Sequence, residues 1–255
     1  MEKKKFFGAN FKQNEIFQLL NYPSFEGNEK SEVVAFVPSF FLSDPILKAI
    51  SKTKAISRGA QDISEFTGGS YTAEPPSPTW LKQAGITDTL IGHSEQRQHY
   101  EDLGVDPQKI NQMFYRKIAQ AINKRIRVTY CIGETADERA RGATEGVLET
   151  QIREGLENLA LTDPTKLIIA YEPRWVIGTD QIPTSTQIKR AHSLVKEYTA
   201  KNLGYASLSH VTAIYGGNMN PENAREILAI PHVDGGLIGR ESHNPERFAE
   251  IVNTV

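Results

Sequence analysis

Short apolar runs recur along the chain, and stretches with helical spacing lie between them. Eight runs have the composition of β-strands and cover residues 5–10, 33–37, 55–59, 89–92, 128–132, 167–171, 211–215 and 236–238. Their mean separation of about 32 residues matches one strand–helix unit each. Most are apolar throughout, as is typical of parallel strands that are buried on both faces. The pattern therefore predicts eight consecutive βα units.

Helix starts are predicted where a capping side chain precedes a proline, which favours the first helical position. This pattern occurs at Ser43-Asp44-Pro45, Asp106-Pro107, Asn220-Pro221 and Asn244-Pro245. The first connection differs, because residues 15–21 allow at most two helical turns before a polar loop.

Eight such units without a linker allow a closed barrel or an open doubly wound sheet. A nucleotide-binding open sheet usually carries GxGxxG or GxxxxGK[ST] after its first strand, whereas this chain continues Gly8-Ala9-Asn10-Phe11-Lys12. The length of 255 residues is also typical of a (β/α)8 barrel. We therefore predict an α/β protein with one (β/α)8 barrel domain over residues 1–255.

Composition narrows the partners that we expect. The chain has 29 basic and 31 acidic residues and thus a net charge of −2. This near-neutral balance argues against a protein that binds nucleic acid. No apolar stretch is long enough for a membrane span, and the N-terminal apolar segment is too short for a secretory signal. The single cysteine, Cys131, excludes an internal disulfide, and zinc-ligand spacings are absent from the sequence. We expect a cytoplasmic protein that uses no metal or cofactor.

Candidate chemistry lies where barrel enzymes place it, at the carboxyl ends of the strands. Lys12, His93 and Glu172 follow the first, fourth and sixth predicted strands. A partly desolvated carboxylate can act as a base. An imidazole at a helix N-terminus stays neutral and can donate a hydrogen bond, and an ammonium group stabilises an enediolate or a phosphate.

Glycines in the turns after the last three strands add a possible phosphate pocket, because their backbone N–H groups can approach an anion closely. They are Gly178, Gly216, Gly217 and Gly239. Each candidate alone has an ordinary structural explanation, such as a solvated lysine, a capping glutamate or a tight turn. Their joint occurrence at several strand ends favours a catalytic site.

Six segments resemble signatures of the triosephosphate isomerase family and occur in the family's order. They are residues 9–12 (ANFK), 91–95 (IGHSE), 131–134 (CIGE), 170–179 (AYEPRWVIGT), 215–218 (YGGN) and 233–235 (VDG). A glutamate base beside a neutral histidine is this family's known acid–base pair. The resemblance implies that Glu172 moves a proton between adjacent carbons of a ketose phosphate and that His93 moves protons between the oxygens. It also implies that Lys12 and Asn10 hold the negative charge.

The resemblance further implies a lid over residues 173–179, with Gly178 reaching the phosphate. Asn218, Gly239 and Arg240 would complete the phosphate site, and Glu95 would support Lys12. Residues 68–77 resemble the family's dimer loop, so a homodimer is expected.

Several residues depart from the family's pattern. Asn218 replaces a serine, Arg240 a glycine and Phe11 a tryptophan, and the segment after the lid, Asp180-Gln181-Ile182-Pro183, is unusual. These differences leave alternatives open. The substrate is expected to be dihydroxyacetone phosphate, in exchange with glyceraldehyde 3-phosphate. A four-carbon ketose phosphate such as erythrulose phosphate is the first alternative, and a non-catalytic phosphate-binding barrel is the second.

Overall fold

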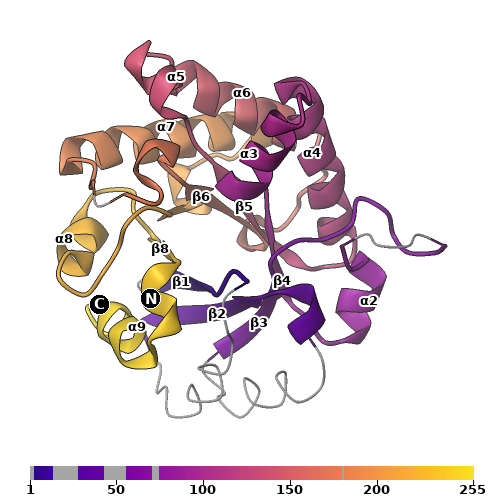
Figure 1. The fold of residues 1–255 in the computed structure, drawn as a ribbon, viewed down its shortest axis with the longest axis horizontal. Coiled ribbons are helices and arrows are strands. Elements are labelled where there is room, and N and C mark those ends of the chain that lie inside the picture. The colour runs from indigo at the N-terminus through magenta and orange to yellow at the C-terminus, as the bar shows by residue number, and fades with distance from the viewer. Residues whose placement is uncertain (1–2, 14–27, 43–55, 71–74, 180) are drawn as a thin grey trace.

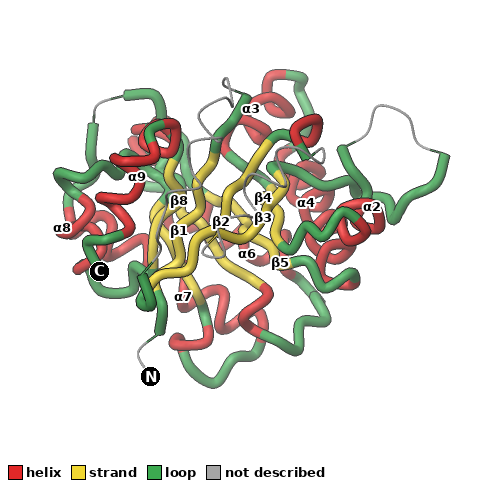
Figure 2. The backbone as a smooth tube through the Cα atoms, turned by 90° about the horizontal axis from the view of Figure 1, so that it is seen from below, coloured by secondary structure: helices red, strands yellow, loops and turns green. Residues whose placement is uncertain are grey.

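The computed structural model describes residues 3–13, 28–42, 56–70, 75–179 and 181–255. Eight strands form a closed parallel barrel in sequence order (Figures 1 and 2). The strands are β1 (Lys5–Asn10), β2 (Ser31–Val37), β3 (Ile56–Ala60), β4 (Asp88–Ile91), β5 (Arg127–Ile132), β6 (Leu167–Tyr171), β7 (Thr212–Tyr215) and β8 (Gly235–Ile238). The first and last strands pair from Phe6 with Gly235 to Ala9 with Ile238, which closes the ring. The predicted (β/α)8 barrel is confirmed.

Helices surround the strands (Figure 2). The α-helices in the described part of the chain are α2 (Pro78–Gln83), α3 (Ser94–Asp102), α4 (Pro107–Asn123), α5 (Ala136–Ala140), α6 (Thr144–Leu156), α7 (Ser185–Leu203), α8 (Ala224–Ala229) and α9 (Pro245–Val252). Short 3-10 turns are η2 (Ser39–Phe41), η3 (Pro164–Lys166), η4 (Arg174–Val176), η5 (Leu208–His210) and η6 (Arg240–His243).

The predicted helix starts at Asp106 and Asn244 are confirmed, because both side chains cap a helix that begins at the following proline. The start predicted at Asn220-Pro221 is wrong, since α8 begins only at Ala224. The side-chain oxygen of Asn223 accepts a hydrogen bond of 2.9 Å from the backbone N–H of Asn220, and that of Asn220 accepts one of 3.0 Å from the backbone N–H of Asn223. These two bonds hold the intervening residues in a turn. The predictions for residues 15–21, 43–45 and 55 lie outside the described residues.

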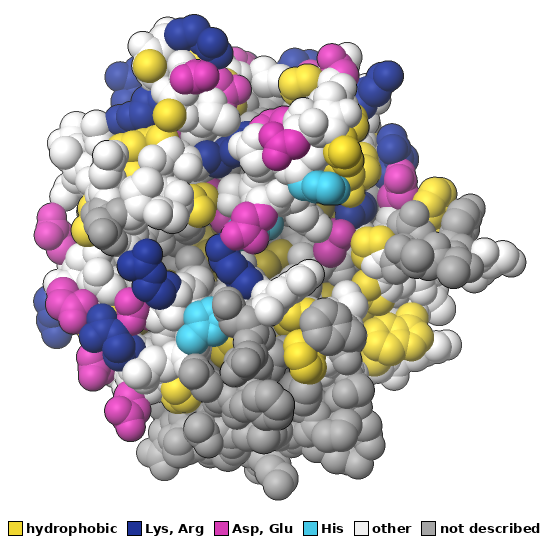
Figure 3. All heavy atoms as spheres, in the orientation of Figure 1, with side chains coloured by type: hydrophobic (Ala, Val, Ile, Leu, Met, Phe, Trp, Pro, Cys, Tyr) yellow, Lys and Arg dark blue, Asp and Glu magenta, His cyan; other side chains and the backbone are white. Residues whose placement is uncertain are grey.

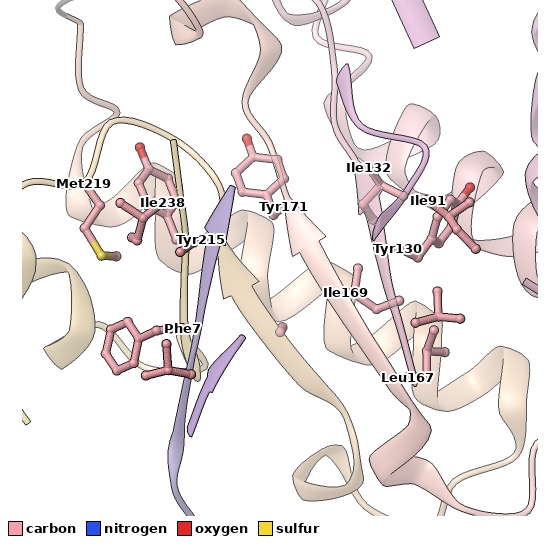
Figure 4. Packing of buried hydrophobic residues seen from close by; sticks show 14 of the residues in the cluster. Phe7, Ile91, Tyr130, Ile132, Leu167, Ile169, Tyr171, Tyr215, Met219 and Ile238 are labelled. Atoms are coloured by element: carbon pink, nitrogen blue, oxygen red, sulfur yellow. The ribbon is translucent and has the colours of Figure 1, made fainter. Parts of the chain in front are cut away.

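Two apolar clusters account for the barrel's core. Alternate strand residues, including Val34, Phe36, Ile168 and Ala170, form one cluster, and the residues between them belong to a larger one. Strand side chains alternate between faces, so the first cluster fills the barrel and the second packs beneath the helices. Figure 4 shows part of the larger cluster, including Tyr171. Because the barrel interior is filled, a substrate site must lie at one of its ends.

His192, on α7, is fully buried within the larger cluster's layer. Its ring lies 5.9 Å from the Tyr171 ring and 6.5 Å from the Tyr215 ring, measured between centroids. Its Nδ1 lies 3.2 Å from the carbonyl oxygen of His232, to which it can donate. Burial lowers the pKa of His192 from 6.5 to about 4.

This shift predicts a loss of stability in mild acid. Between pH 6.5 and about 4 the unfolded chain binds a proton at His192 that the folded protein excludes. Stability from this group is therefore complete above pH 6.5 and falls by up to about 3 kcal/mol as the pH drops to 4. Urea unfolding at pH 7 and pH 4.5 should show a smaller pH-dependent loss for His192→Phe than for the wild type. His99→Phe, at an exposed position, is the control and should lose as much unfolding free energy between pH 7 and pH 4.5 as the wild type does. If His192→Phe also loses as much as the wild type, His192 is not the group that causes the loss.

Candidate active site

Residues at or after the ends of five different strands, β1, β4, β6, β7 and β8, converge on one end of the barrel. Lys12, His93 and Glu172 line a cavity of about 170 Å³, together with Asn10, Gly178, Asn218, Gly239 and Arg240. The structure thus brings together all the predicted site residues except Glu95, which lies beside this cavity in a neighbouring groove of about 590 Å³ that Lys12 and His93 also line. Acidic, basic and histidine side chains are mixed over the face shown in Figure 3 rather than separated by sign.

Glu172 directly follows β6, and only 2% of its surface is exposed. Its Oε2 accepts a hydrogen bond of 2.9 Å from the backbone N–H of Ser94. Its Oε1 lies 3.1 Å from Nε2 of His93. Both contacts lie at the N-terminus of α3, where the helix dipole favours a negative charge. The carboxylate is thus shielded from water but retains partners for its charge.

The chain around Glu172 leaves no space for a side chain at Gly133 or Gly216, which lie next to it in the fold. Its N–H donates to the Ile132 carbonyl at 2.7 Å, which extends the β5–β6 pairing beyond the strand ends. A Cβ atom on Gly133 would lie 1.7 Å from the Glu172 carbonyl oxygen, and one on Gly216 would lie 2.8 Å from its Cγ. Glycines after β5 and β7 therefore let the chain segment that bears the carboxylate lie between them.

His93 is the N-cap residue of α3, and its Nδ1 accepts a hydrogen bond of 3.3 Å from the backbone N–H of Glu95. Because Nδ1 is an acceptor, the proton of the neutral ring lies on Nε2, which faces Glu172. A neutral ring in this tautomer has a hydrogen that it can donate into the cavity, and the neutral state of His93 stays a prediction from the sequence.

Lys12 has a left-handed backbone, with φ of 50°, and two side chains support it. Asn10 Oδ1 accepts from the Lys12 N–H at 3.3 Å. The Gln61 amide donates to the Lys12 carbonyl and to Asn10 Oδ1, both at 3.2 Å. Gln61 was not predicted, although it directly follows β3 and so occupies the same kind of position as the other candidates.

The Lys12 ammonium group forms an ion pair with Glu95. Partial burial disfavours the ionised form of Glu95, but the hydrogen bond from Lys12 and nearby positive charge outweigh it, so the pKa of Glu95 is lowered. The ion pair ties the lysine side chain to the first turn of α3.

The candidate phosphate site consists of residues after β6, β7 and β8 that line the same cavity. Gly178 has a positive φ of 78°, and Arg240 begins η6 with an exposed side chain. Trp175, three residues before Gly178, packs against the Arg139 guanidinium, whose Cζ lies 4.2 Å from the centroid of the Trp175 ring. Asp180, the first residue of the segment that differs from the family's pattern after the lid, lies outside the described residues.

Metal and membrane features are absent from the described part of the chain. Among those residues, no group of three or more His, Cys, Asp or Glu side chains is placed to hold a metal ion. None of the helices that they form combines the length and the apolar character needed to cross a bilayer.

The fold and the site define a (β/α)8 barrel whose cavity at one end is lined by a lysine, a histidine and a buried carboxylate, and the comparisons with known proteins identify its family. A family model described as triosephosphate isomerase matches residues 5–255. A triosephosphate isomerase of Chloroherpeton thalassium is 33% identical over 264 residues, covering 99% of both chains. Those of Thermodesulfovibrio yellowstonii and Chlorobaculum tepidum are 34% and 36% identical, covering 98% and 86% of this chain and 98% and 85% of their own.

This chain therefore belongs to the triosephosphate isomerase family, and it is an isomerase of that type.

The close approach at Gly133 predicts a specific loss of activity. In Gly133→Ala, the new methyl group must displace the Glu172 backbone, because it would otherwise lie 1.7 Å from the carbonyl oxygen. A displacement of about 1 Å in a catalytic group can cost about 100-fold in rate, so we expect kcat to fall by about that factor. Gly146→Ala is the matched control, since its Cβ meets nothing within 4 Å and the substitution favours the helix. Isomerase assays that find equal kcat in both variants would contradict this prediction.

Proposed function

We propose that the protein interconverts dihydroxyacetone phosphate and glyceraldehyde 3-phosphate through an enediolate, with Glu172 as the base. The observation that carries this proposal is the contact between the buried Glu172 carboxylate and Nε2 of His93, 3.1 Å apart, in the cavity that Lys12 also lines. A base and a hydrogen-bond donor placed together in this way suit proton transfer next to a carbonyl group.

The reaction divides among three side chains. Glu172 removes the proton from the carbon next to the carbonyl and returns it to the neighbouring carbon. His93 donates its Nε2 proton to the carbonyl oxygen and takes up the proton of the neighbouring hydroxyl, so that one proton moves between the two oxygens. Lys12, aided by Asn10, supplies a fixed positive charge. Closure of residues 173–179 would exclude water, which strengthens each of these contacts and limits loss of phosphate from the enediolate.

A four-carbon ketose phosphate such as erythrulose phosphate is a second candidate substrate. Asn218 and Arg240 both line the cavity at the end assigned to the phosphate. The arginine brings a long side chain and a permanent charge to a place where the family has glycine. That change suits a substrate that extends further than a triose. A non-catalytic phosphate-binding barrel has less support, because binding alone needs no buried base.

A homodimer is part of the proposal. The groove of about 590 Å³ beside Lys12 is lined by Gln61, Glu95 and Gln96. It adjoins the catalytic side chains, so a second copy's loop of residues 68–77 seated there would cover Lys12 and His93. Residues 71–74 of that loop lie outside the described residues. The cytoplasmic location stays a prediction from the sequence.

Glu172→Gln tests the assignment of the base. The amide keeps the size of the side chain but cannot take up the proton, and positioned acid–base catalysis contributes roughly 10²–10⁴-fold to a rate. We expect kcat to fall by that factor with purified protein and triose phosphate. Glu250→Gln, an exposed change on α9, should leave kcat unchanged. A decrease of less than about threefold for Glu172→Gln, far below that range, would mean that another group is the base.

Arg240→Gly tests the choice between substrates. Removing the guanidinium restores the family's glycine, so the ratio of kcat/KM for triose phosphate over tetrulose phosphate should rise. Both substrates should be assayed side by side with the wild type and the variant. An unchanged ratio would remove the argument from Arg240, and turnover of neither substrate by the wild type would favour the non-catalytic alternative.

A further inference from the structure

Arg174, two residues after the candidate base, forms a clamp with α3 that the proposed chemistry does not use. Its Nη1 and Nη2 donate to Oε1 and Oε2 of Glu101 at 2.9 and 2.6 Å, and Nη2 also donates to Oε1 of Gln98 at 2.8 Å. Only 7% of the Arg174 side chain is exposed, against 29% for Glu101. A two-pronged, nearly buried ion pair fixes both distance and orientation.

The clamp joins the same two elements that meet at the catalytic carboxylate. Glu172 contacts the first turn of α3 through Ser94 and His93, whereas Arg174 contacts the last turn through Glu101. The Arg174 backbone N–H also donates to the Glu134 carbonyl at 3.1 Å, which ties this point to the end of β5. The segment after β6 is therefore attached to α3 on both sides of Pro173.

We propose that Arg174 is a positioning residue, which holds Glu172 against His93 and Ser94 by clamping the start of the lid segment to α3. This inference rests on the proposed function, because it assigns Arg174 to the same reaction. Gly178 and Thr179, at the far end of the segment, are exposed. The contacts with α3 are made by Arg174, at the end of the segment next to the base.

Arg174 could instead act through its charge alone, and the two explanations predict different results. Glu101→Gln removes a negative charge and Arg174→Gln removes a positive one, so a purely electrostatic effect on Glu172 would change kcat in opposite directions. Loss of a clamp lowers kcat in both variants, and the double variant is then little worse than either single one.

The experiment measures kcat and KM for Arg174→Gln, Glu101→Gln and the double variant, with thermal unfolding as a check on folding. We expect kcat to fall by about 10- to 100-fold, as a base displaced by about 1 Å would allow. KM should stay within about threefold, because the clamp does not touch the substrate. Arg174→Lys keeps the charge but loses the two-pronged geometry, so it should recover only part of the activity. Arg153→Gln is the matched control, since it removes an exposed arginine that pairs with the neighbouring Glu154 on α6, and it should behave as wild type.

Changes in kcat of opposite sign for Arg174→Gln and Glu101→Gln, or additive losses in the double variant, would overturn the clamp. Wild-type kcat in Arg174→Gln would overturn it as well. If the wild type itself turned over no sugar phosphate, the proposed function would fail, and the clamp would still be tested by amide hydrogen exchange. Exchange at residues 175–177 should then speed up in Arg174→Gln but not in Arg153→Gln, and unchanged exchange would reject the clamp.

Discussion

Closure of the barrel is the constraint on which the site depends. The parallel pairing of β1 with β8 brings the two ends of the chain together and fixes the order of all eight strand ends around one opening. Lys12 after β1, His93 after β4 and Glu172 after β6 can share a cavity only because the ring is closed. In an open sheet the same residues would lie along an edge, and the first and last strands would be far apart.

The position of Glu172 shows how the barrel makes a buried carboxylate tolerable. An unpaired charge is costly in an apolar interior, yet this side chain is 2% exposed. Its two oxygens face a backbone N–H and an imidazole N–H at the start of α3, so its charge has partners while water is largely excluded. The same surroundings leave it close to Gly133 and Gly216, which is why small changes nearby should affect catalysis more than folding.

Much of this arrangement can be predicted from the sequence, because strand ends are marked by strong local patterns. Each predicted strand lies within one or two residues of an observed one, and the candidate trio Lys12, His93 and Glu172 was identified from polar residues at the ends of apolar runs. Gln61 and Arg174 were missed for physical reasons. Gln61 follows a strand with a weak pattern, and the contacts of Arg174 depend on Glu101, which lies on another element. Pairings between distant elements leave no mark in local composition.

The cavity is lined both by the candidate catalytic side chains and by residues that depart from the family's pattern. Glu172, His93 and Lys12 each have at least one hydrogen bond to a neighbouring element or to the backbone next to them. Arg240 is exposed at the start of η6, and Asn218 is half-buried. Under the proposed function, a change at either of these two residues alters the shape and charge of the cavity wall, whereas the contacts of Glu172 with Ser94 and His93 involve neither of them. A barrel built in this way can therefore alter which sugar phosphate it accepts while it keeps the same proton-transfer groups.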